Sequence, residues 1–284
     1  MKSKLVTSPA TMTTSRRSAD YPLGNTDAEH ERLIRQSRQI APTTERFFRE
    51  AGVGPGQRVL DIGSGVGDVA MLVARLVGPS GEVVAVERDP KSIAKARDRV
   101  AEAGFHNVRF NESTVGEILD EQPFDAAVGR FILMYLPDPV AALRSISQMV
   151  RPGGVLVFQE PCWVPVLAHL APLPLWFATA TLIDQTMRAA ANHDMGTDLY
   201  QTFVKAGLPE PVMRMELPLG KEPYLAQWYY DTLWSLRPQA EQLHLPTESL
   251  GSLDTLVQRL QAEVAESKTV ACWFASVGAW SCKA

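Results

Sequence analysis

The motif VLDIGSGVGDVA occupies residues 59–70. Its first four residues form a short β-type run that ends at Gly63, and apolar residues at helical spacing begin again at Val69. Glycines at such a strand-to-helix turn permit positive φ and let a ligand approach the backbone closely. The spacing here is G-x-G-x-G, whereas turns that bind dinucleotides carry G-x-G-x-x-G. We therefore expect this turn to hold a ligand other than a dinucleotide.

Two acids beside this turn indicate which kind of ligand suits it. Asp61 precedes the first glycine, and Glu87 ends the next apolar run, where an acid can accept hydrogen bonds from ribose hydroxyls. The turn lacks the Lys-Ser/Thr pair of a phosphate-binding loop, and its acids would repel a pyrophosphate. A cationic ligand with a ribose and no phosphate fits best, and S-adenosylmethionine has that combination. The alternative is a structural turn with incidental acids.

Short β-type runs alternate with helical patterns over the middle of the chain. Five such runs are expected at residues 59–62, 83–86, 107–110, 125–128 and 155–159. Their alternation with helices favours right-handed βαβ crossovers and a parallel sheet covered on both faces. Two later runs, Val212–Leu219 and Phe274–Cys282, are expected to add a sixth and a seventh strand.

The expected organisation is a flexible leader over residues 1–25 and one domain over residues 26–284. The leader lacks the apolar core of a secretory signal, although its Ser-, Thr- and Arg-rich composition is also that of a transit peptide. Thr26-Asp27-Ala28-Glu29 is a capping box, so a helix is expected to begin near Asp27 and to bend or break at Pro42. The expected parts of the domain are a helical segment at 26–57, a cofactor-binding core at 58–160, and cap insertions at 161–195 and 219–268.

Composition limits the classes of function. The chain has 284 residues, 45% of them hydrophobic, with 28 Lys+Arg, 32 Asp+Glu and a formal net charge of −4. It lacks the basic field of non-specific nucleic-acid binding and any window apolar enough to span a membrane, so neither is expected as a partner. Cys162, Cys272 and Cys282 have the spacing of neither a disulfide framework nor a zinc site. We therefore expect no metal and a cytoplasmic location.

Four stretches together resemble the successive motifs of class I S-adenosylmethionine-dependent methyltransferases, in particular the bacterial enzymes that act on small molecules. They are VLDIGSGVGDVA (59–70), VVAVERDP (83–90), FDAAVGRFILMYLPDP (124–139) and VRPGGVLVFQEP (150–161). The resemblance implies a Rossmann-like, doubly wound α/β fold. Its seven-stranded sheet is mostly parallel with the last strand antiparallel, and helical cap insertions cover the site. It also implies an enzyme that converts S-adenosylmethionine to S-adenosylhomocysteine.

The resemblance further assigns roles to the residues of the cofactor site. It places the methionine part of the cofactor beside Asp61, Gly63, Ser64 and Gly65. It assigns binding of the ribose to Glu87.

Residues after the second, third and fourth runs complete the expected cofactor site. Arg88 is expected to flank the adenine. Ser113 and Thr114 stand where the family usually has an acid for the adenine amino group, and a hydroxyl can accept the same hydrogen bond without charge. Gly129 and Arg130 are expected near the sulfonium and the mouth of the substrate pocket.

A general base is needed only where the acceptor must lose a proton. The candidates are His193, His169 and His244 together with Glu160 at the end of the fifth run. His193 is favoured because its sequence neighbours are polar and it lies where the chain returns to the core fold. The alternative is a structural role, which is the more common one for a lone histidine in an apolar stretch.

The cap segments are rich in aromatic residues, which suits an apolar small molecule. Tyr21, Trp163, Trp228 and Tyr229 are the expected substrate-binding residues. The alternative is that these aromatic side chains pack the core of the cap itself.

The leading hypothesis is methyl transfer to oxygen, nitrogen or carbon of an apolar small molecule, as in secondary metabolism. The reaction would depend mainly on proximity and desolvation. Alternatives on the same fold are a cyclase, decarboxylase or hydroxylase that uses the cofactor differently, and a ligand-binding protein without catalysis. A nicotinamide-dependent dehydrogenase is disfavoured by the glycine spacing and by Asp61. The sequence does not specify the acceptor or the oligomeric state, and a homodimer is compatible with it.

Overall fold

The computed structural model describes residues 26–118 and 122–284. The predicted leader, including Tyr21, lies outside the described residues. None of the helices in these two ranges combines the length and apolar character that crossing a membrane requires.

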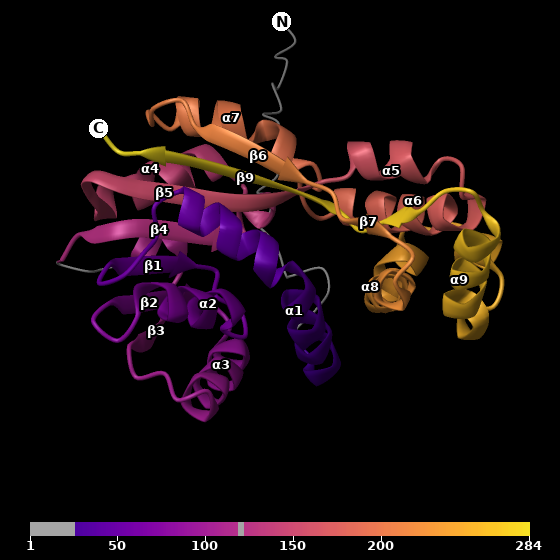
Figure 1. Ribbon diagram of the computed structural model, residues 1–284, viewed down its shortest axis with the longest axis horizontal. Helices are drawn as coiled ribbons and strands as arrows, with labels where there is room; N and C mark the ends of the chain where they lie inside the picture. The colour runs from indigo at the N-terminus through magenta and orange to yellow at the C-terminus, as the bar shows by residue number, and fades with distance from the viewer. Residues whose placement is uncertain (1–25, 119–121) are drawn as a thin grey trace, which may run out of the picture.

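One seven-stranded sheet forms the centre of the molecule (Figure 1). Its strands, in spatial order, are β3 (Val108–Glu112), β2 (Glu82–Glu87), β1 (Arg58–Ile62), β4 (Phe124–Arg130), β5 (Val150–Cys162), β9 (Ala275–Cys282) and β6 (Val212–Glu216). Only β9 runs against its neighbours, pairing antiparallel with both β5 and β6. The predicted fold, with seven strands and an antiparallel last strand, is confirmed.

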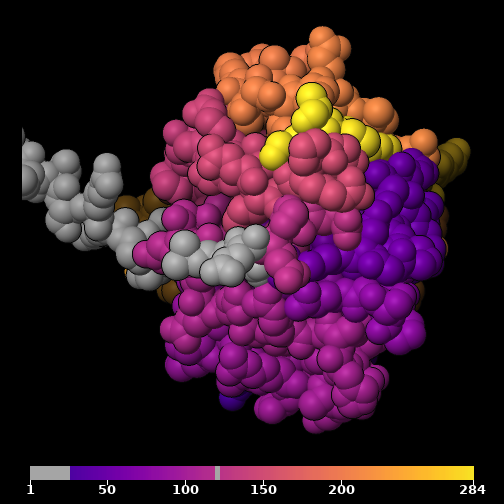
Figure 2. Space-filling model, turned by 90° about the vertical axis from the view of Figure 1, so that its left-hand side faces the viewer, coloured from indigo at the N-terminus to yellow at the C-terminus, as the bar shows by residue number. Residues whose placement is uncertain are grey.

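Helices cover both faces of this sheet, as continuous apolar strands require. The helices next to the sheet are α1 (Asp27–Glu50), α2 (Asp68–Val77), α3 (Pro90–Glu102), α4 (Pro139–Met149) and α7 (Met195–Lys205). The layers α2–α3 and α4–α7 lie on opposite faces, each over its own cluster of buried apolar residues. In Figure 2 the surface changes from purple through pink and yellow to orange from bottom to top, and this sequence of colours follows the strand order of the sheet.

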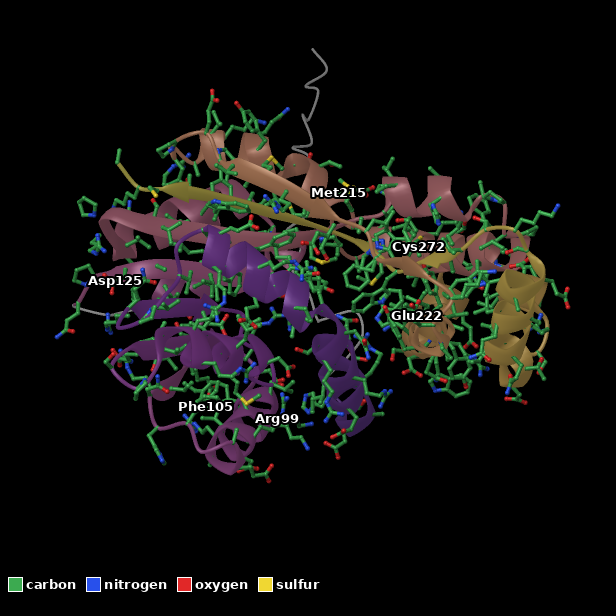
Figure 3. All side chains as sticks on the ribbon, in the orientation of Figure 1. Arg99, Phe105, Asp125, Met215, Glu222 and Cys272 are labelled. Carbon is green, nitrogen blue, oxygen red and sulfur yellow. The ribbon has the colours of Figure 1, made fainter. Side chains whose placement is uncertain are left out.

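The remaining elements form a cap at one end of the sheet (Figure 1). They are α5 (Val164–Leu170), α6 (Pro174–Arg188), α8 (Pro223–Gln242) and α9 (Leu256–Glu266), with the short ribbon β7 (Leu219–Gly220) and β8 (Ala271–Cys272). Short 3₁₀ turns complete the chain at η1 (Val115–Glu117), η2 (Leu133–Tyr135), η3 (Thr247–Leu250) and η4 (Leu253–Thr255). In Figure 3, Cys272 and Glu222 mark the cap, and Asp125 marks the opposite end of the sheet.

Local capping explains where several of these helices begin. The Thr26 side chain accepts a hydrogen bond from the Glu29 N–H at 3.2 Å, which starts α1 as predicted. Asp89 caps α3 in the same way, with Pro90 in its first turn. α1 continues through Pro42 without a break, and Figure 1 shows its two ends inclined to each other.

The sixth strand differs from its prediction. The run Val212–Leu219 was expected to be one strand, but β6 ends at Glu216, and Leu219 pairs instead with Cys272 in the ribbon. Most of β6 is solvent-exposed at the edge of the sheet, so burial does not enforce a long strand there. The two-residue pairing of β7 with β8 carries no sequence pattern of its own.

Candidate functional site

The glycine-rich turn lies at the carboxyl end of β1, at the edge of the sheet where the cap begins. Gly63 has φ 69°, and a Cβ there would lie 2.6 Å from Cδ1 of Ile132. The N–H groups of Gly63 and Ser64 both donate to the carbonyl oxygen of Val86 in the next strand. The turn therefore needs glycine both for its backbone conformation and for close packing against the segment after β4.

Glu87 connects this turn with the start of α3. Its carboxylate accepts hydrogen bonds from the N–H groups of Gly65 at 3.0 Å, Arg88 at 2.8 Å and Asp89 at 3.0 Å. A carboxylate offers about four acceptor positions, so capacity remains for a hydroxyl donor. Glu87 is thereby fixed in orientation, half-buried and able to accept from a ribose.

Asp61 is a buried acid directly before the glycine-rich turn. Its side chain is fully buried at the end of β1, and neither carboxylate oxygen has a hydrogen-bond partner among residues 26–118 and 122–284. Burial raises the pKa of Asp61 to about 7, and the guanidinium of Arg130 opposes that shift. A cationic ligand bound above the turn would stabilise the ionised form of Asp61. The two carboxylates at this end of the site thus fit a cofactor that carries a positive charge and a ribose.

One cavity of about 770 Å³ joins this turn to the cap. Its lining includes the predicted cofactor residues Gly63, Ser64, Gly65, Glu87, Arg88, Ser113, Thr114 and Arg130. Asp61 lies beneath this surface, and Gly129 packs below it, where a Cβ would be 2.6 Å from Cε1 of Phe158. The structure therefore brings most of the predicted cofactor residues to one surface.

Ser113 and Thr114 follow β3 and continue this surface. The Thr114 hydroxyl donates to the carboxylate of Glu117 at 2.8 Å, and the two residues form a capping box at the start of η1. The Ser113 hydroxyl donates to the carbonyl oxygen of Thr114 at 3.0 Å. These bonds fix both hydroxyl groups at the position where the family usually has an acid.

The cap supplies an aromatic surface to the same cavity. Trp163, Trp228 and Phe274 line it, with Trp228 5.0 Å from Phe274 and 6.4 Å from Trp163 between ring centroids. Tyr229 is fully buried and packs edge-to-face against Trp163 and Trp176, and it does not belong to the lining. Two of the predicted substrate-binding residues therefore face the cavity, and Tyr229 packs the interior of the cap.

Helix α1 forms a third side of the cavity, which sequence reasoning missed. His30, Arg32, Leu33 and Gln36 all belong to the lining. The side-chain oxygen of Gln36 accepts hydrogen bonds from Nη1 of Arg32 and Nε1 of Trp228, each at 2.8 Å. An amphipathic pattern shows that a helix buries one face, but it does not identify what that face contacts.

Arg130 is the last residue of β4, and Glu160 lies near the carboxyl end of the neighbouring strand β5. Arg130 donates from Nη1 to the Thr44 hydroxyl at 3.2 Å and from Nη2 to the Ser37 hydroxyl at 3.0 Å, which joins β4 to α1. Glu160 is fully buried and accepts from the N–H groups of Ile132 and Leu133 at 3.1 and 2.8 Å. Burial raises its pKa to about 8. Its contacts are those of a cap for η2, and Glu160 does not belong to the lining of the cavity.

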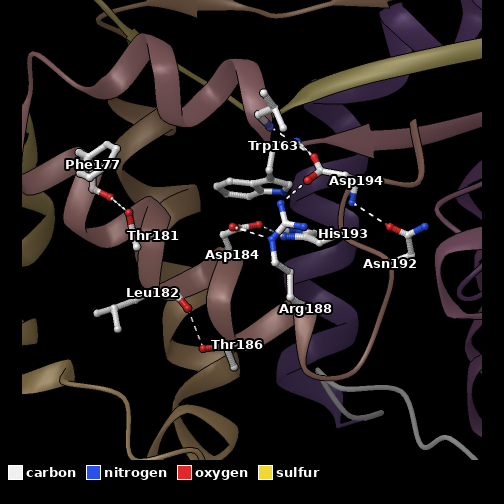
Figure 4. A network of polar contacts seen from close by, with 11 residues as sticks. Trp163, Phe177, Thr181, Leu182, Asp184, Thr186, Arg188, Asn192, His193 and Asp194 are labelled. Carbon is white, nitrogen blue, oxygen red and sulfur yellow. Dashed lines mark hydrogen bonds and ion pairs between the residues drawn. The ribbon is translucent and has the colours of Figure 1, made fainter. Parts of the chain in front are cut away.

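His193 lies in a network of charged groups on the cap side (Figure 4). Its Nδ1 is 3.0 Å from Oδ1 of Asp184, and Oδ2 of the same carboxylate accepts from Nε of Arg188 at 2.8 Å. Arg188 also pairs with Asp194, whose other oxygen accepts from the Trp163 N–H at 2.6 Å. His193 belongs to the cavity lining, whereas Nε2 of His169 is bonded to the carbonyl oxygen of Val270 away from it.

Comparisons with known proteins agree with this geometry. A family model described as a methyltransferase domain matches residues 54–207. Arsenite methyltransferase of Halobacterium salinarum is 30% identical over 125 residues, covering 44% of this chain and 30% of that protein. Ubiquinone/menaquinone biosynthesis C-methyltransferase UbiE of Vibrio vulnificus is 33% identical over 121 residues, covering 41% of this chain and 46% of that protein. The chain thus spans less than half the length of these curated relatives.

Solved structures share the fold over most of the chain. The YcgJ protein of Bacillus subtilis matches with a TM-score of 0.52 at 13% identity, covering 87% of this chain and 100% of that one. The (4+2)-cyclase SpnF matches with a TM-score of 0.51 at 16% identity, covering 86% of this chain and 81% of that one. The resemblance of the four sequence motifs is confirmed by the family match, and this chain belongs to the S-adenosylmethionine-dependent methyltransferase domain family.

Proposed function

We propose that this chain transfers a methyl group from S-adenosylmethionine to an apolar small-molecule acceptor. One observation carries the proposal: a single cavity of about 770 Å³ combines the polar surface of the glycine-rich turn with the aromatic surface of the cap. Cavities of this size are typical of small-molecule sites.

The polar end of the cavity would hold the cofactor. Glu87 would accept from the ribose hydroxyls, Asp61 would stabilise the positive charge, and Ser113 and Thr114 would lie near the adenine, with Arg88 at its flank. When bound, S-adenosylmethionine supplies an activated methyl group, and its sulfonium sulfur leaves as a thioether with the electrons of the broken bond.

The aromatic end of the cavity would orient the acceptor and exclude water. Trp163, Trp228 and Phe274 offer flat apolar surfaces, and Ile183 and Met187 of α6 add aliphatic ones. Methyl transfer needs the acceptor atom held close to an already activated carbon in a dry site, so positioning supplies most of the rate acceleration. This lining favours a small apolar molecule over a polymer.

The proposal includes a cytoplasmic location and no nucleic-acid or membrane partner. The formal net charge of −4 offers no broad basic field. Cys162 and Cys272 are buried free thiols, which suits a reducing compartment. A place in secondary metabolism would suit the apolar lining of the cap.

Calorimetric titration with S-adenosylmethionine and S-adenosylhomocysteine tests the proposal directly. We expect both to bind at one site, and label from methyl-labelled S-adenosylmethionine to appear in a small-molecule product. Binding of neither would overturn the proposal. Consumption of an acceptor without formation of S-adenosylhomocysteine would instead identify an enzyme that uses the cofactor differently.

A further inference from the structure

The cap holds a histidine–carboxylate pair at the surface of the cavity. His193 and Asp184 are both buried, with exposed side-chain fractions of 6% and 9%, and Nδ1 of the ring lies 3.0 Å from Oδ1 of the carboxylate. The ring also lies against Trp163, at 4.6 Å between ring centroids and an interplanar angle of 31°. The imidazole is therefore held in position from its edge and from its face.

This contact determines which ring nitrogen carries the proton. Hydrogen bonds from His193 and Arg188 hold the pKa of Asp184 below its usual range, although burial opposes them, so Asp184 is an ionised acceptor. Nδ1 must then be the donor. Burial lowers the pKa of His193, so the ring is neutral at pH 7 and Nε2 carries a lone pair.

Nε2 is the nitrogen that remains available. It makes no hydrogen bond with any residue in the ranges 26–118 and 122–284, and His193 belongs to the cavity lining. The charged groups that act on the ring are Asp184, which contacts Nδ1, Arg188 on α6, and Asp194 at the start of α7. A neutral imidazole held by a carboxylate, with its free nitrogen at a ligand cavity, is the arrangement of a general base.

We propose that His193, positioned by Asp184, is the general base of this enzyme, and that the acceptor carries an acidic hydroxyl, phenolic or enolic, methylated on oxygen. The inference rests on the proposed methyl transfer and specifies its acceptor. The hydroxyl proton passes to Nε2 of His193, and an electron pair of the acceptor oxygen forms the new O–C bond. The electron pair of the old S–C bond stays on sulfur, and the imidazolium later releases its proton to water.

An acidic hydroxyl is the acceptor that makes best use of this base. A phenol has a pKa near 10, so it is mostly protonated at pH 7 and gains from a base as the new bond forms. A neutral amine already presents a lone pair and needs no base before attack. The apolar lining from Trp163, Trp228 and Phe274 suits the ring of a phenol.

The first test needs no acceptor and no cofactor. In the ¹⁵N spectrum of the free protein at pH 7.5, we expect His193 to be neutral, with Nδ1 protonated and Nε2 unprotonated. The Asp184→Asn variant removes a charge that raises the pKa of His193, so the ring is expected to stay neutral to still lower pH. A ring protonated at Nε2 in the wild-type protein would overturn the proposal.

The second test identifies the methylated atom and the base together. The protein is incubated with ¹³C-methyl S-adenosylmethionine and a small-molecule extract of its source cells, and the ¹³C shift of each product separates methyl groups on oxygen, nitrogen, sulfur and carbon. We expect O-methyl products. The variant His193→Asn keeps an amide donor toward Asp184 but removes Nε2, and we expect its kcat to fall by about 10²–10⁴-fold.

Matched variants separate this inference from the proposed function and from misfolding. His106→Asn changes an exposed histidine between α3 and β3 and is expected to keep wild-type kcat. Asp184→Asn is expected to lower kcat because the imidazolium loses its charged partner, and Asp184→Glu is expected to recover part of that loss. The assignment of His193 as general base is overturned if methyl groups appear only on nitrogen, sulfur or carbon. It is also overturned if a folded His193→Asn variant keeps its kcat. Neither result would contradict methyl transfer itself. If the wild-type protein does not bind the cofactor, the proposed function itself is contradicted.

Discussion

At the scale of single residues, Glu87 gives the most direct test of the cofactor site. Its carboxylate holds three backbone N–H groups, including that of Gly65, and has capacity left for a ribose hydroxyl. A hydrogen bond to a charged group is worth about 1.5–3 kcal/mol, so Glu87→Ala is expected to weaken binding of S-adenosylmethionine by more than about tenfold. Isothermal titration calorimetry measures this change.

Glu82 provides the control because it lies at the other end of the same strand. It pairs with Arg58 and Arg109 and does not line the cavity. Glu82→Ala is expected to leave cofactor affinity unchanged. An equal loss of affinity in both variants would show that β2, and not the carboxylate of Glu87, accounts for the effect.

The buried carboxyl group of Glu160 is expected to make the stability of the protein depend on pH. Burial raises its pKa from 4.5 to about 8, although the N–H groups of Leu133, Ile132 and Met134 lower it. The folded protein therefore keeps a proton that the unfolded chain releases near pH 4.5. The free energy of unfolding must then fall as pH rises from about 4.5 to about 8.

The variant Glu160→Gln is expected to lack this contribution, so its stability falls less steeply over that pH range than that of the wild-type protein. Urea denaturation at several pH values measures both slopes. Glu263→Gln is the matched control, since Glu263 also accepts from backbone N–H groups, those of Leu175 and Trp176 at the start of α6. Equal slopes in Glu160→Gln and wild type would contradict the assignment.

Sequence patterns predict the position of a residue when that position depends on local geometry. They do not predict contacts between residues that lie far apart in the sequence. Gly63 and Glu87 could be placed because a glycine-rich turn and the end of the next strand have a fixed relation in a βαβ unit. The polar sequence neighbours of His193 favour it over His169, but they do not predict that His193 lines the cavity while Nε2 of His169 is bonded to Val270. That distinction arises only when α6 and β8 are packed.

At the scale of secondary-structure elements, α1 connects the sheet region with the cap. Gln36 lies on its buried side and accepts from both Arg32 and Trp228, so it joins α1 to α8 of the cap. Gln36→Leu leaves Nε1 of Trp228 without this acceptor. We expect the free energy of unfolding to fall by about 1–3 kcal/mol, measured by urea denaturation.

A glutamine on the exposed side of α8 provides the comparison. Gln227 is exposed and donates to Asp231 in the same helix, and Gln227→Leu is expected to change stability by less than about 0.5 kcal/mol. If the two variants lose similar stability, the contact between α1 and α8 does not contribute as we argue.

Regular elements were predictable because their patterns are local. The five alternating runs matched strands of the sheet, since strands buried on both faces must be continuously apolar. The ribbon of β7 and β8 could not be predicted, because two residues in each strand carry no periodicity. The contact of α1 with the cap was equally hidden, since its apolar pattern fits any buried surface.

At the scale of the whole molecule, the sheet and the cap share one hydrophobic core. The same cluster of buried side chains contains Ile62 of β1, Phe158 of β5, Trp176 of α6 and Leu260 of α9. Because no polar layer separates the sheet from the cap within this cluster, loss of the cap would expose apolar surface of the sheet. We therefore expect one cooperative thermal transition in calorimetry.

A ligand in the shared cavity should then stabilise sheet and cap together. At a concentration 100 times its Kd, S-adenosylhomocysteine is expected to add about 2.7 kcal/mol to the free energy of unfolding and to raise the single Tm. The Glu87→Ala variant is expected to keep one transition but to need a higher ligand concentration for the same shift. Two transitions, of which the ligand moves only one, would mean that the cap unfolds independently. The cavity would then be a surface of the sheet alone, and the aromatic residues of the cap would have no fixed place beside the cofactor.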